Sequence, residues 1–384
     1  MLTVVLMAPN AVFAYDFSAA APTGQTLYYN INGNSVTLTC PYETEDYQGW
    51  DNLPTPSGIL SIPASVNHNG QTYSVTKIGD YAFDCCSTLT SVTIPNTVTA
   101  IGASAFNFCY ALTSISIPNS ITNIGNAAFY SCTSLTSIVL PNSLTRLGGA
   151  SFELCTALTS VTLSDGITTI NPGTFSGCSS LQSLTIPNTV TVIGSGAFEN
   201  CSALTSITLP DSITKIKSEA FKSCTGLTSL TLGRSLTNIY DDAFNGCRNI
   251  ANITIYAVNP PTLGNNVFNG VPSNINVYVP CGKQLLYYAR WTHFSNFIEM
   301  CNSGIDDVNA LSANVYSVQG RIVVERGDGG PLGEVRVCDM MGRSLATGGV
   351  SAEGTNRYSF DVPATGTYCV KIGNLPARKV VVIR

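Results

Sequence analysis

The sequence predicts an α/β-type repeat solenoid of 23-residue coils with a parallel sheet, followed by a small all-β sandwich. Three observations predict this fold class. Phe recurs at a fixed spacing from Phe83 to Phe244, short stretches of alternating apolar and polar residues recur in the same register, and the pattern is lost after Cys301. Self-similarity with a period of roughly 20–50 residues is typical of solenoids and related arrays.

The repeat unit is defined by columns of apolar residues. Phe occurs every 23 residues, Cys follows each Phe after three positions, and Leu or Ile follows each Cys after three more. The Phe–Cys pairs are Phe83–Cys86, Phe106–Cys109, Phe129–Cys132, Phe152–Cys155, Phe175–Cys178, Phe198–Cys201, Phe221–Cys224 and Phe244–Cys247. A degenerate copy around Phe268 follows after 24 residues.

Each repeat is expected to contain one short strand and one turn region. In the stretch LTSVTIPN the apolar residues alternate with polar ones, which is typical of a strand with one buried face. Pro95 cannot continue a hydrogen-bonded ladder and Asn96 tolerates turns, so the strand ends there. The stretch IGxxAFxxC points Ala, Phe and Cys inward from a turn or a short helical stretch. Because one coil cannot bury its own apolar stripe, the coils stack about 4.8 Å apart and pair their strands.

Atypical segments flank the repeats. Residues 1–14 are apolar and end in Val12-Phe13-Ala14, which favours a signal peptide with a truncated, uncharged start over the alternative of a buried strand. We expect an N-terminal β cap at residues 15–77, the repeats at 78–256 and a C-terminal cap at 257–302, with a strand at 275–279 and a helix at 282–291. The caps cover the apolar faces of the terminal coils.

The C-terminal part of the chain is predicted to be a separate domain. Residues 303–312 are expected to form a linker, and residues 313–384 contain strand-like segments such as RIVVER, GTYCVKIG and KVVVIR. Gly, Pro and Asp turns separate these segments, which indicates a small β-sandwich.

The repeat motif IGxxAFxxCxxLTSxTIPNSxTx resembles the BspA-like leucine-rich repeats of bacterial surface proteins of the Bacteroidetes type. The resemblance covers about residues 58–280 and makes the predicted solenoid a leucine-rich-repeat array. It implies an exported protein, secreted or held on the exterior of the outer membrane. Because several family members are adhesins, it also implies adhesion to host matrix proteins or to other cells.

Residues 313–384 resemble the C-terminal sorting domain of type IX secretion. The resemblance implies passage across the outer membrane, after which such a domain is often removed. An ordinary immunoglobulin-like spacer domain is the alternative. The segments that carry the resemblance are Val335-Arg336-Val337, Gly342-Arg343, Gly366-Thr367-Tyr368, Val370-Lys371-Ile372 and Lys379-Val380-Val381-Val382.

The composition excludes two classes of partner. Only 11% of residues are charged and the net charge is -5, so the chain lacks the basic stripe that nucleic-acid binding requires. No Lys or Arg precedes Lys77, and no apolar run reaches the roughly 20 residues of a membrane span. We therefore expect neither nucleic acid as a partner nor a transmembrane segment.

No catalytic or metal-binding constellation is found. The two His residues lie in opposite caps, His68 in a polar turn and His293 beside aromatic residues, and neither has an orienting carboxylate nearby in the sequence. We therefore predict a protein that is not an enzyme and has no cofactor.

The cysteines fall into two groups. The eight repeat cysteines stack in register and point the same way, which favours a column of small buried thiols over disulfides. Cys281 and Cys301 flank the predicted C-cap helix and are candidates for one disulfide. Cys338 and Cys369 lie in neighbouring predicted strands and are candidates for another.

The candidate partner-binding face is formed by the strand positions between the buried residues, on the side expected to be concave. It is a nearly uniform hydroxyl surface, although Ser and Thr also serve as simple fillers of exposed strand positions. Its candidate residues are Ser114, Ser116, Ser137, Val139, Ser160, Thr162, Ser183, Thr185, Ser206 and Thr208.

Two hypotheses for function follow. In the first, a monomeric repeat array binds a host matrix protein or another cell-surface protein. In the second, the chain is a glycan-binding module for polysaccharide capture, and Trp50 and Trp291 in the caps stack on sugars.

Overall fold

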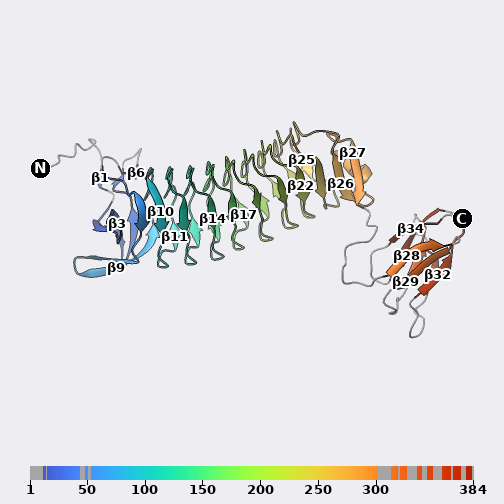
Figure 1. Ribbon diagram of the computed structural model, residues 1–384, viewed down its shortest axis with the longest axis horizontal. Helices are drawn as coiled ribbons and strands as arrows, with labels where there is room; N and C mark the ends of the chain where they lie inside the picture. The colour runs from blue at the N-terminus through green and yellow to red at the C-terminus, as the bar shows by residue number, and fades with distance from the viewer. Residues whose placement is uncertain are drawn as a thin grey trace. The chain divides into compact units, whose positions relative to one another are not determined.

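The computed structural model divides into two compact units, residues 1–299 and 300–384 (Figure 1). It describes residues 12–13, 15–43, 48–50, 53–300, 313–318, 321–326, 335–339, 344–348, 357–364, 366–372 and 378–382. Most of the predicted signal peptide and the whole predicted linker at 303–312 lie outside these residues. Within the predicted signal peptide, β1 (Val12–Phe13) pairs antiparallel with β5 (Tyr42–Glu43).

The first unit is the predicted solenoid, and its coils stack through two rows of strands. The strands of the first row form three separate sheets, and successive coils pair in parallel within each sheet, as in Ser137↔Ser160. The first row comprises β7 (Gly58–Ser61), β10 (Leu89–Thr93), β12 (Ser114–Ser116), β14 (Ser137–Val139), β16 (Ser160–Thr162), β18 (Ser183–Leu184), β20 (Ser206–Thr208), β22 (Ser229–Leu232), β24 (Asn252–Ile255), β26 (Asn276–Pro280) and β27 (Asn296–Met300). The fold class predicted from the periodicity is confirmed.

The second row of strands was not predicted. It is built mostly from two-residue strands at the Ile that closes each repeat, where Ile101 pairs with Ile124 and Ile124 with Leu147. The row comprises β9 (Gln71–Ile78), β11 (Ala100–Ile101), β13 (Asn123–Ile124), β15 (Arg146–Leu147), β17 (Thr169–Ile170), β19 (Val192–Ile193), β21 (Lys215–Ile216), β23 (Asn238–Ile239) and β25 (Thr262–Leu263). Strand pairing therefore holds most adjacent coils together on two sides, and the second row is interrupted between β15 and β17.

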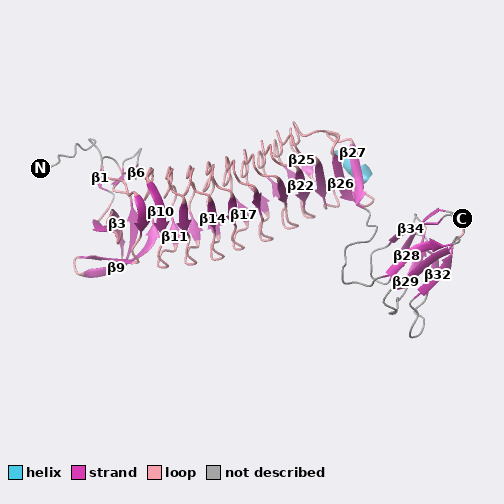
Figure 2. Cartoon of the chain, viewed as in Figure 1, coloured by secondary structure: helices cyan, strands magenta, loops and turns pink. Residues whose placement is uncertain are grey.

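Turns, and not helices, connect the second row back to the first (Figure 2). Among the described residues of the repeats, the stretch around each Phe is a succession of turns, so the short helical stretch that the sequence also allowed is not formed. These turns hydrogen-bond to the next coil through their main chain, as when Phe106 N donates to Ala128 O at 2.8 Å.

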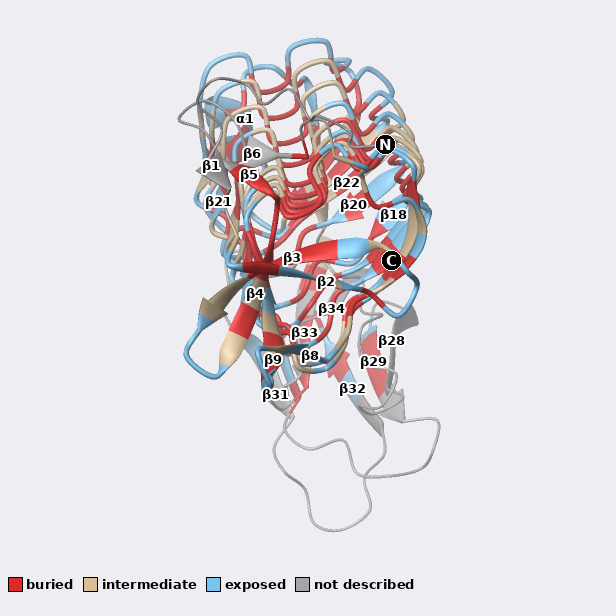
Figure 3. Ribbon diagram, turned by 90° about the vertical axis from the view of Figure 1, so that its left-hand side faces the viewer, coloured by how far each residue is buried: buried red, intermediate tan, exposed pale blue. Residues whose placement is uncertain are grey.

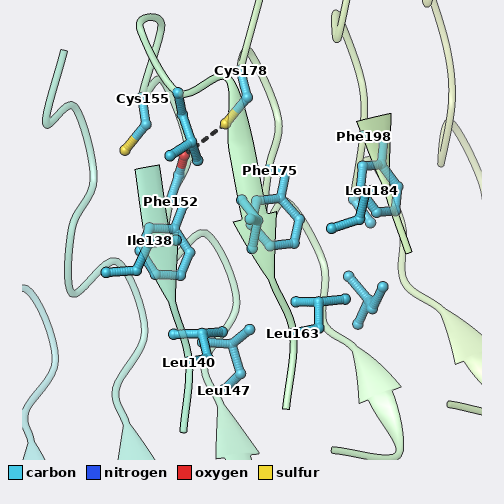
Figure 4. Close-up of a cluster of buried hydrophobic side chains, with 14 of the residues drawn as sticks. Ile138, Leu140, Leu147, Phe152, Cys155, Leu163, Phe175, Cys178, Leu184 and Phe198 are labelled. Atoms are coloured by element: carbon cyan, nitrogen blue, oxygen red, sulfur yellow. Dashed lines mark hydrogen bonds between the residues drawn. The ribbon is translucent and has the colours of Figure 1, made fainter. Parts of the chain in front are cut away.

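The core is a set of in-register side-chain columns that run along the coil stack. The Phe rings from Phe83 to Phe268 stack with adjacent centroids 5.1–5.7 Å apart. Beside them, each Cys thiol from Cys109 to Cys247 donates to the Phe carbonyl of the preceding coil at 3.0–3.3 Å. Figure 4 shows one such bond, from Cys178 to Phe152. The repeat cysteines are free and buried, which confirms the predicted thiol column.

The N-terminal cap covers the first coil with antiparallel strands (Figure 3). The strands β2 (Phe17–Ala20), β3 (Thr26–Asn32) and β4 (Ser35–Thr39) extend the second row, and β4 pairs in parallel with β9. The edge of β7 is occupied by side chains, because Gln25 Nε2 donates to Ser57 O and Ile59 O. Two further strands complete this region, β6 (Gln48–Gly49) and β8 (Ser65–His68).

The C-terminal cap closes the other end of the column. The helix α1 (Gln284–Arg290) lies within the predicted range, and β26 matches the predicted strand to within one residue. Tyr287 Oη donates to Ala257 O at 2.7 Å, and Trp291 Nε1 donates to Pro261 O at 3.1 Å. Cys281 is disulfide-bonded, and its predicted partner Cys301 lies outside the described residues.

The second unit is all-β in its described residues. It has a three-stranded sheet, β28-β29-β32, and a four-stranded sheet, β31-β30-β33-β34, which share one buried cluster that includes Ile322, Val337 and Val370. The strands are β28 (Ala313–Val318), β29 (Arg321–Arg326), β30 (Val335–Cys338), β31 (Ser344–Gly348), β32 (Arg357–Asp361), β33 (Gly366–Ile372) and β34 (Arg378–Val382).

The predicted disulfide between Cys338 and Cys369 is wrong. The two residues are direct neighbours across β30 and β33, as the sequence suggested, but Cys338 is a free thiol. Directly opposite residues on paired strands hold their Cβ atoms about 4.5–5.5 Å apart, whereas a disulfide needs about 3.8 Å.

Candidate functional site

The predicted partner-binding residues form one continuous exposed surface, which we call the hydroxyl face. From β12 to β20, the first-row strands bury one residue and expose the residues on either side of it, as in Ser114 and Ser116 around Ile115. The register of the parallel pairs aligns these exposed residues into two rows along the stack. All ten predicted residues are exposed: Ser114, Ser116, Ser137, Val139, Ser160, Thr162, Ser183, Thr185, Ser206 and Thr208.

The chemistry of the hydroxyl face is polar but uncharged. A neighbouring column of Thr residues uses its hydroxyls within the stack, since Thr113 Oγ1 donates to Thr90 O and Thr159 Oγ1 to Thr136 O. Within the serine row, Ser114 Oγ donates to Ser91 Oγ at 3.4 Å. Val139 interrupts the hydroxyls with a side chain that is 65% exposed. The face thus offers donors and acceptors repeated about every 4.8 Å, the spacing of paired strands.

The predicted glycan-stacking residues are not available for stacking, so that assignment is wrong. Trp50 is 4% exposed and donates its indole N–H to Ala82 O, and Trp291 is 0% exposed. Trp291 packs 5.3 Å from Phe268, the last ring of the Phe column. Each indole therefore covers one end of the apolar core. Without this cover, the terminal coil would expose its apolar side chains to water.

The two histidines hold structural positions. His68 ends β8 and stacks on Phe17 with ring centroids 4.3 Å apart, so it is packed and not simply a solvated turn residue. His293 Nε2 lies 2.8 Å from Val271 O. Within the residues that the structure describes, no group of three or more His, Cys, Asp or Glu side chains is arranged to hold a metal ion.

Two hollows lie away from the hydroxyl face. One, of about 200 Å³, is lined on the second row by Lys77, Asn123 and Arg146 and floored by glycines such as Gly125. The other, of about 360 Å³, lies beside the C-terminal cap between Phe268 and His293.

An exposed aromatic cluster on the turns was not predicted from the sequence. Phe108 lies 5.5 Å from Tyr130 and 5.8 Å from Tyr110, measured between ring centroids, and Tyr110 is 47% exposed. We call these three residues the aromatic ridge. A comparison across repeats would have found it. The residue two positions after the column Phe is Gly in three coils and small or polar in most others, but it is Phe at position 108.

The described part of the chain contains no helix with the length and hydrophobicity needed to cross a membrane.

Comparisons with known proteins agree with the observed architecture. Segments 76–204, 150–275 and 191–300, together more than half of the chain, match the family model described as "BspA type Leucine rich repeat region", in six copies. No curated protein matches the chain.

Solved structures of repeat proteins are also similar to the chain. A leucine-rich repeat protein from Bacteroides ovatus is 22% identical, over 74% of this chain and 100% of that one, with a TM-score of 0.34. A leucine rich cell surface protein from Faecalibacterium prausnitzii is 23% identical, over 74% and 95%, with a TM-score of 0.34. The pneumococcal vaccine antigen PcpA is 17% identical, over 75% and 100%, with a TM-score of 0.36.

Proposed function

Because the chain belongs to the family of BspA-type leucine-rich repeat proteins, we propose that it is a non-catalytic binding protein that acts outside the cell and attaches to another protein through its solenoid. Its partner is a host matrix protein or a protein on a neighbouring cell. Export by the predicted signal peptide and the sorting-domain-like C-terminal unit is part of the proposal.

The observation that carries this proposal is the hydroxyl face. Its two rows are exposed over successive coils and contain no charged residue from Ser91 to Thr231. An extended, regular polar surface on a rigid support suits many weak contacts with a large partner, and such contacts reinforce one another.

Glycan capture is not retained as a second candidate. Its sequence argument rested on Trp50 and Trp291, and both indoles are buried.

The test is binding of the full chain to a panel of immobilised matrix proteins and glycans, with two matched variants. Ser160→Arg places a long charged side chain on the hydroxyl face. Thr168→Arg places the same side chain on an exposed position of the same repeat, next to the second-row strand β17.

Saturable binding to a matrix protein that Ser160→Arg abolishes and Thr168→Arg preserves supports the proposal. Equal binding by both variants would exclude the hydroxyl face as the contact surface. Binding to glycans alone would overturn the assignment of a protein partner.

A further inference from the structure

The aromatic ridge departs from the repeat that surrounds it. Phe108, Tyr110 and Tyr130 lie on the turns of two adjacent coils, and Phe108 contacts both tyrosines. Phe108 and Tyr130 are half-buried, and Tyr110 is exposed. Energetically dominant contact sites are enriched in aromatic residues of this kind, whereas the hydroxyl face contains none.

The backbone at Phe108 has a φ of 56°, in the left-handed region where bulky residues are rare. The same conformation recurs at the equivalent position of the other coils, at glycines such as Gly177 and also at non-glycine residues such as Ser131 and Leu154. The repeat therefore imposes this conformation, and what distinguishes Phe108 is the aromatic ring that it places there.

Main-chain hydrogen bonds hold an acidic side chain in register with the ridge. Phe108 N donates to Tyr130 O at 2.9 Å, and Ser131 N donates to Glu153 O at 2.8 Å. Glu153 therefore occupies the same position in its coil as Tyr130 does in the preceding one.

The turn segments around the ridge carry acidic residues and no basic residue, whereas Lys77 and Arg146 lie on the second row. The turn segments 79–88, 102–112, 125–135 and 148–158 carry three charged residues, Asp80, Asp84 and Glu153. Burial, together with repulsion from Glu199, raises the pKa of the Glu153 carboxyl. In the part of the chain that the structure describes, Glu153 forms no ion pair, since Lys222 is held by Glu199 at 3.6 Å and Glu219 at 2.7 Å.

We propose that the aromatic ridge receives an arginine side chain of the protein partner, with the guanidinium over the rings of the ridge and Glu153 as its counter-charge. This inference deepens the proposed function and rests on it. Aromatic faces attract cations, and the planar guanidinium stacks on rings and pairs with carboxylates. The ridge thus supplies the specific anchor, and the hydroxyl face supplies the extended contact.

The test uses the full chain and a fluorescently labelled octapeptide, Gly-Ser-Arg-Gly-Ser-Arg-Gly-Ser. Its matched control carries citrulline in place of both arginines, which keeps the shape and removes the charge. We expect fluorescence anisotropy to show saturable binding of the arginine peptide and binding of the citrulline peptide that is weaker by on the order of tenfold.

Three variants separate binding from folding. Phe108→Gly removes the ring and relaxes the backbone, so it should weaken binding by on the order of tenfold without lowering the unfolding temperature. Glu153→Gln should also weaken binding, and its effect should shrink at high salt. Tyr256→Ala removes a tyrosine that is 42% exposed outside the ridge, and it should leave binding unchanged.

Equal binding by the wild-type chain and Phe108→Gly, or equal loss in Tyr256→Ala, would overturn the inference. If Phe108→Gly keeps full matrix-protein binding while Ser160→Arg abolishes it, the inference fails and the proposed function stands. Ridge-dependent peptide binding without any matrix-protein binding would support the arginine site and overturn the proposed matrix partner.

Discussion

Ser151 is the position where a single substitution should make the solenoid more stable. It occupies the column just before the Phe, where other coils have alanine, as at Ala128 and Ala197, and it is 0% exposed. Its Oγ has no hydrogen-bond partner. A buried polar group without a partner costs about 1–3 kcal/mol. Because alanine already fits this column, we expect Ser151→Ala to raise the free energy of unfolding by about 1 kcal/mol.

Thr174 provides the matched control in the next coil of the same column. It is also 0% exposed, but its Oγ1 donates to Asn171 O at 2.7 Å. Thr174→Ala removes this bond and a buried methyl group, so it should lower the free energy of unfolding by about 1–2 kcal/mol. The two substitutions thus have opposite expected signs.

Tryptophan fluorescence during urea and thermal unfolding is a suitable assay, because both Trp residues of the chain belong to the first unit. A change of about 1 kcal/mol corresponds to a shift of about 2–4 °C in the midpoint of a large domain. A lower midpoint for Ser151→Ala, or shifts of the same sign for both variants, would refute the assignment of Ser151 as an unsatisfied hydroxyl.

Four further outcomes are expected. Ala127 has φ 53° where Gly173 occupies the equivalent position, so Ala127→Gly should raise the free energy of unfolding by about 1 kcal/mol, and a lower thermal midpoint would contradict this. Burial raises the pKa of the Cys201 thiol from 9.0 to about 12. Because the thiol therefore ionises at lower pH in the unfolded chain, the free energy of unfolding should be constant below pH 9 and fall between pH 9 and 12. Urea midpoints at about pH 8 and pH 10.5 measure this fall, which should be smaller in Cys201→Ala. Alkylation of the native chain should modify the exposed Cys85 before any column thiol. The reaction should be slow, because partial burial and Asp84 raise the pKa of the Cys85 thiol to about 11. Mass spectrometry identifies the modified residue, and Cys85→Ala is the control. Acrylamide should quench Trp291 poorly in the native chain, since it is 0% exposed, and quenching equal to that of the unfolded chain would disprove its burial.

The sequence was sufficient for the coil and its stacking because these depend on repetition. A buried residue such as Phe106 stacks on its own equivalents, so a fixed spacing in the sequence becomes a fixed position in space. The thiol column followed from the same argument. The second strand row could not be predicted, because a two-residue strand such as Ala100–Ile101 has no periodicity of its own.

The exposed residues of the candidate site could be predicted where apolar and polar residues alternate along a strand. The burial of the tryptophans and the aromatic ridge could not be predicted in this way. The exposure of Ser137 and Ser160 follows from strand geometry alone. The burial of Trp291 depends on its packing against Phe268, a contact between distant parts of the chain that composition does not reveal. The aromatic ridge depends on φ at Phe108, which a residue of that size rarely adopts and which propensity argues against.

The uniform coil has a consequence for how such a chain changes over generations. Main-chain bonds join residues that are 23 positions apart, as in Thr122 N to Thr99 O and Thr145 N to Thr122 O. Removal or duplication of one whole unit, for instance by unequal recombination between similar repeats in the gene, brings together two faces that already complement each other. The coil that ends at Phe268 accommodates one extra residue with its ring still stacked on Phe244, but a change of several residues would set the Phe and Thr columns out of line. The length of the solenoid can therefore change in whole coils, by about 4.8 Å for each coil, while its two caps stay the same.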